Sequence, residues 1–162
     1  MFTVTLTDAE IVTCRLLGGM RSLTARKYSV LDRKMADLQG IDIDQDGMMA
    51  EFAFCKKMNL FCDIVPSPRS GSSDAIFQGK RIDVKSTRHA QGRLLSTLKE
   101  NNDIDIYVLA IIAGDQVKFP GFATRDELIN QGTKIDLGYG TGYGLEQHQL
   151  RTWKLEYWDK KG

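Results

Sequence analysis

The sequence predicts a mixed α/β (α+β) domain in which a mixed central β-sheet is flanked by helices and preceded by an N-terminal helical segment. Helix signals dominate residues 1–59, whereas strand-like runs dominate residues 60–119. The chain has 162 residues, of which 42% are apolar, and this is enough to bury one sizeable core. We therefore expect a single domain built around one sheet.

The N-terminal part of this domain, residues 1–46, is predicted to be helical. Thr7–Glu10 has the form of a capping box, which opens a helix that Gly18-Gly19 is expected to end. Apolar residues at helical spacing predict a second helix over residues 28–38, ended by Gly40.

A third helix is predicted over residues 47–59, with Asp46 as its N-cap. Asp42, Asp44, Asp46 and Gly47 imitate the start of a calcium-binding loop. The twelfth position of such a loop carries a bidentate Glu, and here it is Ala53. We therefore expect an acidic turn before the helix rather than a calcium site.

The central part, residues 47–130, holds the expected sheet. Its strand-like runs are 60–65, 75–78, 81–86, 104–113 and 116–119. The run IDIYVLAIIA at 104–113 is long and β-branched, as a central strand should be. Thr124–Glu127 forms a second capping box and opens a short helix.

The last part, residues 131–162, is predicted to contain a loop and one strand. The stretch GYGTGYG at 138–144 has too many glycines for a helix or strand. Apolar and polar residues alternate over 152–157 and predict a C-terminal strand.

Composition narrows the cellular setting more than the function. The formal charge of +1 excludes a polybasic arm or an acidic tail, although a local basic patch remains compatible with it. Cys14, Cys55 and Cys62 form no CxxC pair, which favours a reducing, intracellular and hence cytoplasmic location. Since no signal-like start and no apolar run of about 20 residues is present, no membrane segment is expected.

The segment 73–87 is predicted to be a hairpin with Gly79-Lys80 at its tip. In that register Phe77 opposes Ile82, Ala75 opposes Val84, Ile76 opposes Asp83 and Asp74 opposes Lys85. Alternate residues of a strand share a face, and so do directly opposed residues. Two carboxylates, Asp74 and Asp83, are therefore expected beside the ammonium of Lys85.

A further acidic residue stands out in the third helix. Glu51 is the only polar residue between Met48 and Cys55. A carboxylate on so apolar a helix is costly to bury unless it is paired or bound to a metal. A place for Glu51 on a solvent-facing stripe remains the alternative.

Glu51, Asp74 and the tripeptide Asp83-Val84-Lys85 together resemble the PD-(D/E)xK nuclease superfamily, as found in phage and bacterial endonucleases and resolvases. The resemblance spans about residues 47–130 and implies a restriction-endonuclease-like core. The proline that often precedes the first motif acid is absent, because Ser73 stands there. The alternative is a surface hairpin with an ordinary Asp–Lys ion pair.

This resemblance implies a catalytic set of Glu51, Asp74, Asp83 and Lys85. The three carboxylates and the backbone carbonyl of Val84 would bind Mg²⁺, for which Mn²⁺ is a possible substitute, because hard cations prefer oxygen ligands. Lys85 would orient the attacking water or stabilise developing charge, and both roles stay open.

DNA is the partner that the resemblance implies, and residues 80–99 carry a basic cluster beside the motif. The DNA-binding residues expected there are Arg81, Ser86, Thr87, Arg88, His89 and Arg93.

The expected activity is metal-dependent hydrolysis of DNA phosphodiester bonds by an endodeoxyribonuclease of junction-resolving, homing, phage or repair type. A homodimer is expected, because two opposed cuts need two sites. The alternatives are a catalytically inactive DNA-binding or structural member of the same fold, and a nuclease that acts on RNA or on DNA ends.

Overall fold

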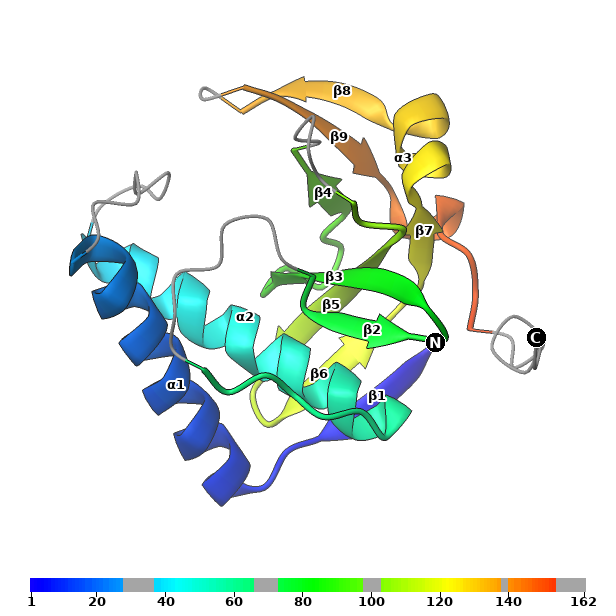
Figure 1. Cartoon of the computed structure of the whole chain (residues 1–162). Helices are drawn as coiled ribbons and strands as arrows, with labels where there is room; N and C mark the ends of the chain where they lie inside the picture. The colour runs from blue at the N-terminus through cyan, green and yellow to red at the C-terminus, as the bar shows by residue number, and fades with distance from the viewer. Residues whose placement is uncertain (28–36, 66–72, 98–102, 138–139, 154–162) are drawn as a thin grey trace.

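The computed structural model describes residues 1–27, 37–65, 73–97, 103–137 and 140–153, with the side chains of 25–27 and 37–39 outside this description. Figure 1 shows the chain. Its elements are β1 (Phe2–Thr5), α1 (Asp8–Lys27), α2 (Asp37–Met58), β2 (Ala75–Phe77), β3 (Lys80–Thr87), β4 (Leu94–Ser96), β5 (Ile106–Ala113), β6 (Gln116–Phe119), β7 (Phe122–Thr124), α3 (Arg125–Gln131), β8 (Thr133–Asp136), β9 (Thr141–Leu145) and the 3₁₀ helix η1 (Gln147–Gln149).

The main sheet is mixed, as the sequence predicts. Its strands lie in the order β1-β6-β5-β3-β2, and β7 pairs with β5 beyond the end of β6. β3 and β5 are parallel, while the other pairs are antiparallel. The predicted mixed α/β fold with N-terminal helices is therefore confirmed.

Among the described residues, two apolar cores lie on the two faces of β5, and β3 contributes to the first of them. Ile82 and Val84 of β3 face the core that contains Met48 and Phe54 of α2. Tyr107 of β5 belongs to the second core, which it shares with residues of α3 and of a small antiparallel sheet, β4-β9-β8. In Figure 1, α1 and α2 lie side by side and α2 packs against the main sheet, while the small sheet and α3 lie at the other end of the molecule. Within the described residues, no helix is long and apolar enough to cross a membrane.

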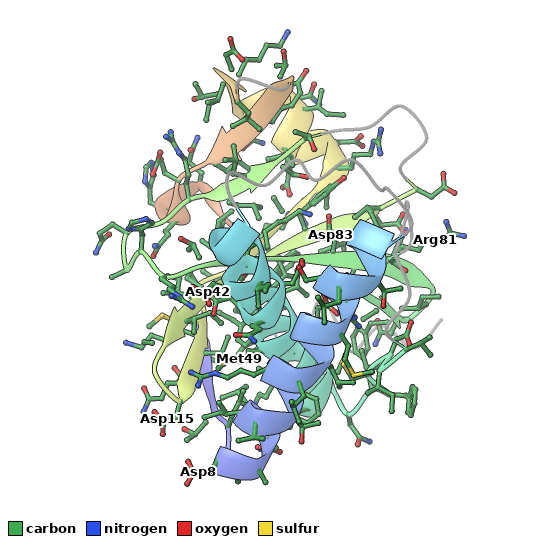
Figure 2. The ribbon with its side chains drawn as sticks, turned by 90° about the vertical axis from the view of Figure 1, so that its left-hand side faces the viewer. Asp8, Asp42, Met49, Arg81, Asp83 and Asp115 are labelled. Carbon is green, nitrogen blue, oxygen red and sulfur yellow. The ribbon has the colours of Figure 1, made fainter. Side chains whose placement is uncertain are left out.

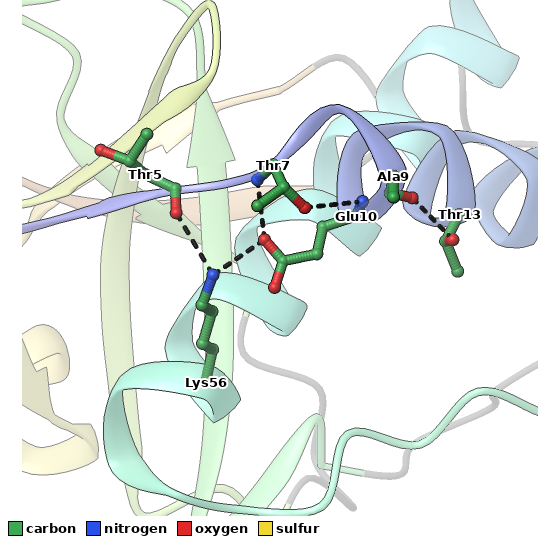
Figure 3. A network of polar contacts seen from close by, with 6 residues as sticks. All are labelled: Thr5, Thr7, Ala9, Glu10, Thr13 and Lys56. Atoms are coloured by element: carbon green, nitrogen blue, oxygen red, sulfur yellow. Dashed lines mark hydrogen bonds and ion pairs between the residues drawn. The ribbon is translucent and has the colours of Figure 1, made fainter.

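The predicted capping box opens α1. The Thr7 backbone N–H donates to Glu10 Oε2 at 2.8 Å, and the Glu10 backbone N–H donates to Thr7 Oγ1 at 3.3 Å (Figure 3). Lys56 of α2 donates to the same Glu10 oxygen at 2.8 Å. The Lys56 and Thr7 hydrogen bonds lower the pKa of Glu10. The box therefore also ties the start of α1 to the end of α2.

The expected end of this helix at Gly18-Gly19 is wrong, since α1 continues through both glycines to Lys27. A Cβ on Gly18 would lie 2.6 Å from the Cα of Gln45 in α2. Gly18 is therefore the point at which the two helices approach each other, and the missing side chain serves packing rather than termination.

This contact predicts opposite effects for two neighbouring substitutions. Gly18→Ala should lower stability by about 1–3 kcal/mol, because its methyl group meets the backbone of α2. Gly19→Ala should be neutral or stabilising by up to about 1 kcal/mol, because its Cβ would meet only the Gln45 Nε2 atom, at 3.8 Å, and Ala is the better helix former. Thermal unfolding of both variants checks this, and a Gly18→Ala variant as stable as the parent would contradict it.

The second and third predicted helices are not separated as expected. α2 is one helix over Asp37–Met58, so Gly40 does not end a helix and Asp46 is not an N-cap. The acidic residues Asp42, Asp44 and Asp46 lie on helical turns and form no calcium-binding loop. Most of the predicted helix at 28–38 lies outside the described residues.

Three further predictions need correction. Residues 60–65 form no strand. The glycine-rich stretch 138–144 is only partly a loop, because β9 begins at Thr141. Of the predicted strand at 152–157, the described residues Thr152 and Trp153 are not in a strand, and the others lie outside the described residues.

Candidate active site

The predicted hairpin forms, but with a shifted register. Ala75 pairs with Ile82, and Phe77 pairs with Lys80. Gln78 and Gly79 form the two-residue turn, with φ of 50° and 75°, as tight hairpins require. The shift from the predicted register is two residues. Because strand side chains alternate with period two, an even shift leaves every side chain on its predicted face.

Asp74 lies just before β2, at the edge of β3. Its backbone N–H donates to the Ile82 carbonyl at 2.8 Å, and its Oδ2 accepts the backbone N–H of Val84 at 2.7 Å. The two polar groups of a strand residue point to the same edge, so the Val84 carbonyl also faces the Asp74 side of β3.

The carboxyl group of Asp74 faces strong negative charge. Burial raises the pKa of Asp74 well above its ordinary value, and the nearby charges of Glu51 and Asp83 raise it further. The Val84 hydrogen bond and the charge of Lys85 oppose this rise. The charges of Glu51, Asp83 and Lys85 therefore all act on the Asp74 carboxyl group.

Asp83 and Lys85 are joined on β3, as the motif predicts. Lys85 Nζ lies 2.7 Å from Asp83 Oδ2, with 37% of the Lys85 side chain and 15% of the Asp83 side chain exposed. Burial acts to lower the pKa of Lys85, but the charge and hydrogen bond of Asp83 outweigh it and raise that pKa. Lys85 therefore keeps its positive charge beside the carboxylates.

Glu51 is partly buried rather than placed on a solvent-facing stripe. Its Oε2 lies 2.8 Å from Arg21 Nη1, and both side chains are only 12% exposed. Arg21 Nη2 also donates to the Asp63 carbonyl at 2.7 Å. Burial acts to lower the pKa of Arg21, but the charge and hydrogen bond of Glu51, together with other nearby acidic groups, outweigh it and raise that pKa. An internal cation on α1 thus holds the helix carboxylate of the predicted site.

The donor chemistry of this cluster suits a hard divalent cation. Asp74 is a carboxyl group whose ionisation is opposed by two other carboxylates, and a cation would relieve that repulsion. No three His, Cys, Asp or Glu side chains of the described residues are arranged as a ready-made metal site. In this structure the Glu51 carboxylate contacts Arg21 of α1.

Two of the residues predicted to bind DNA, Arg81 and Arg88, are engaged in short ion pairs. Arg81, at the start of β3, contacts Asp103 at 2.8 Å, and Figure 2 labels it near Asp83. Arg88, just after β3, contacts both carboxylate oxygens of Asp46 on α2, at 2.6 and 3.0 Å.

The other four predicted DNA contacts meet at one place. Together with Lys85 they line an open pocket of about 580 Å³ between the end of β3 and the small sheet. These four residues are Ser86, Thr87, His89 and Arg93.

Two residues of the site were not predicted. Arg21 follows Ile11, Cys14 and Gly18 at helical spacing, which places it on the inner face of α1. A charged residue on an otherwise apolar helix face is the sequence signal that could have identified Arg21. Tyr107, a fully buried side chain, is the register partner of Asp83 on β5. Burial and then the charge of Asp83 raise the pKa of Tyr107. Nothing in the local sequence shows this parallel pairing.

Comparison with known proteins gives a family but no activity. No curated protein and no solved structure matches the chain. One family model matches residues 2–125, a range that includes Glu51, Asp74, Asp83 and Lys85 and ends at the start of α3. Because the match covers more than half of the chain, the protein belongs to DUF5843, a family of unknown function.

Proposed function

We propose that the protein is a Mg²⁺-dependent endodeoxyribonuclease that hydrolyses DNA phosphodiester bonds, of the junction-resolving, homing, phage or repair type. The observation that carries the proposal is the position of Asp74. This partly buried carboxyl group accepts the Val84 backbone N–H at 2.7 Å and lies within the electrostatic reach of Glu51, Asp83 and Lys85. The same four residues form the sequence pattern that resembles PD-(D/E)xK nucleases.

The residues that would hold the ion are Glu51, Asp74, Asp83 and the carbonyl of Val84. When bound, Mg²⁺ or its substitute Mn²⁺ supplies a polarised phosphate and a more acidic water. The Arg21 guanidinium already contacts one oxygen of Glu51, so this ion pair would compete with the metal for the Glu51 carboxylate.

Lys85 supplies the positive charge of the protein itself. Its ammonium group is fixed 2.7 Å from Asp83 and stays protonated, so it donates hydrogen bonds and does not act as a base. A cation held in place at a partly buried site stabilises the negative charge that develops on a phosphate without first having to reorganise. This favours charge stabilisation and water orientation as its role.

The proposal predicts cleavage that depends on a divalent metal. Purified protein is incubated with supercoiled plasmid, a branched DNA junction, single-stranded DNA and RNA, in Mg²⁺, in Mn²⁺ and in EDTA. We expect the DNA substrates to be cut with either metal and to stay intact in EDTA. Without the metal, the carboxylates carry only negative charge and cannot polarise the phosphate or activate water.

The other outcomes separate the alternatives. Nicked and then linear plasmid marks internal cutting, whereas shortening from the termini alone would indicate an enzyme of DNA ends. Cleavage of RNA alone would contradict DNA as the substrate and support a ribonuclease. DNA that is bound but left uncut in both metals would contradict the enzymatic proposal and support a DNA-binding member of the fold.

A further inference from the structure

The pocket next to Lys85 has a wall that is fixed by side chains from a distant part of the chain. The wall is the segment 88–93, which connects β3 to β4. Gln147 of η1 donates from Nε2 to two carbonyls of this segment, those of Ala90 and Gly92, both at 2.9 Å. The segment is therefore attached to η1, the 3₁₀ helix that follows β9.

The opposite end of the wall is fixed to the helical layer. Arg88 makes its two contacts with Asp46 of α2, and the His89 backbone N–H donates to Thr87 Oγ1 at 3.2 Å. Gly92 lies so close to Thr87 that a Cβ on it would be 2.5 Å from the threonine methyl carbon. The pocket is thus formed before any ligand arrives, which lowers the entropic cost of binding.

The lining combines groups that recognise different parts of a nucleotide. Lys85 and Arg93 are cations that suit a phosphate, and the Ser86 hydroxyl adds a hydrogen-bonding group. His89 and Leu95 supply an aromatic ring and an apolar side chain against which a base can lie.

The cation at Arg93 remains accessible. Its Nη1 lies 3.5 Å from Glu146 Oε1, and about half of each side chain is exposed, at 48% and 50%. So long and exposed an ion pair is worth little, and a guanidinium carries five N–H donors. Arg93 can therefore bind a phosphate without losing a strong partner.

The size of the pocket selects the kind of nucleic acid. About 580 Å³ is in the range of small-ligand sites and accommodates one nucleotide. A base that is paired and stacked in a duplex cannot enter such a space until it has been pulled out of the stack. We propose that the pocket binds one unpaired nucleotide of single-stranded DNA, next to the phosphate that is cut. This deepens the proposed function, and only the position of the cut phosphate rests on it.

The inference is tested by binding without cleavage. Fluorescence anisotropy in EDTA compares a 5′-labelled oligothymidylate of about 15 nucleotides with a blunt duplex of the same length. We expect the single strand to bind about tenfold more tightly than the duplex. Arg93→Gln should weaken single-strand binding by about tenfold and change duplex binding less than about twofold. Arg15→Gln, the same charge change at an exposed position of α1, should leave both within about twofold.

A second variant is expected to change the single-strand affinity in the opposite direction. Glu146→Gln removes the one carboxylate found among the described residues that line the pocket, and it should tighten single-strand binding severalfold. The inference therefore stays testable if Arg93→Gln is unstable. Equal affinity for the two DNAs, or a single-strand affinity that neither pocket variant changes, would overturn it. Because EDTA removes metal-dependent cleavage, a single-strand preference in a protein that cuts nothing refutes only the nuclease proposal. Cleavage without that preference refutes only the pocket.

Discussion

Asp83→Asn is expected to reduce DNA cleavage by about a thousandfold or more at saturating Mg²⁺. The substitution keeps the size of the side chain but removes its charge. One of the negative charges that would compensate a metal is then lost, and Lys85 loses the partner that holds its ammonium group at 2.7 Å. Initial rates of plasmid nicking by parent and variant measure the effect.

Asp115→Asn is the matched control. Asp115 is exposed in the turn between β5 and β6, and Figure 2 labels it at the lower left of the molecule, well away from Asp83. This control should cut at the parent rate. If Asp83→Asn also cuts at the parent rate while folded, Asp83 is not in the catalytic set.

Arg21→Met is expected to destabilise the protein by about 3 kcal/mol in EDTA, or roughly 6–12 °C in the unfolding midpoint. Glu51 would keep its partly buried position but lose the cation at 2.8 Å, and an unpaired carboxylate in such a place is costly. Mg²⁺ should raise the midpoint of this variant more than that of the parent, because the freed carboxylate becomes a ligand. Thermal unfolding with and without Mg²⁺ gives both numbers.

Arg15→Met separates this effect from a general loss of positive charge. Arg15 lies on the same helix but is exposed, so its replacement should shift the midpoint by less than about 0.5 kcal/mol in either condition. An Arg21→Met variant that is as stable as the parent, or that gains no more from Mg²⁺ than the parent, would contradict the assignment of Glu51 to the site.

Local chemistry accounts for the elements that were predicted correctly. Thr7 and Thr124 form reciprocal hydrogen bonds with a glutamate three residues later, and such boxes involve only neighbours in the chain. The long β-branched run that became β5 is buried over all but its last residue. Four strands have only three or four residues each: β1, β4, β7 and β8. They form because of their pairing partners, so the local sequence pattern does not predict them.

Glycine was the main source of error, because its role depends on neighbours that are distant in sequence. Gly18 was predicted to end a helix, yet it lies inside α1, where its missing side chain lets the backbone of Gln45 in α2 approach closely. Gly142 was predicted to lie in a loop, yet it belongs to β9, and a Cβ there would meet Leu137 at 2.7 Å. In both cases the small residue permits a close approach that only the folded chain reveals.

The candidate site was predictable where it depended on strand parity. The faces of Asp74, Asp83 and Lys85 survived a register error of two residues, because side-chain direction repeats with that period. Arg21 and Tyr107 were missed because one comes from a separate helix and the other from a strand paired in parallel. The charges that surround the site therefore depend on tertiary contacts and could not be predicted from the local sequence.

The central claim is that the carboxylates around Asp74 bind a divalent metal for phosphodiester hydrolysis. Calorimetric titration of Mn²⁺ into the parent, Asp83→Asn and Asp115→Asn proteins tests it most directly. We expect saturable binding to the parent and to Asp115→Asn, and binding at least about tenfold weaker to Asp83→Asn. Mn²⁺ affinity that is the same in all three folded proteins would contradict the claim.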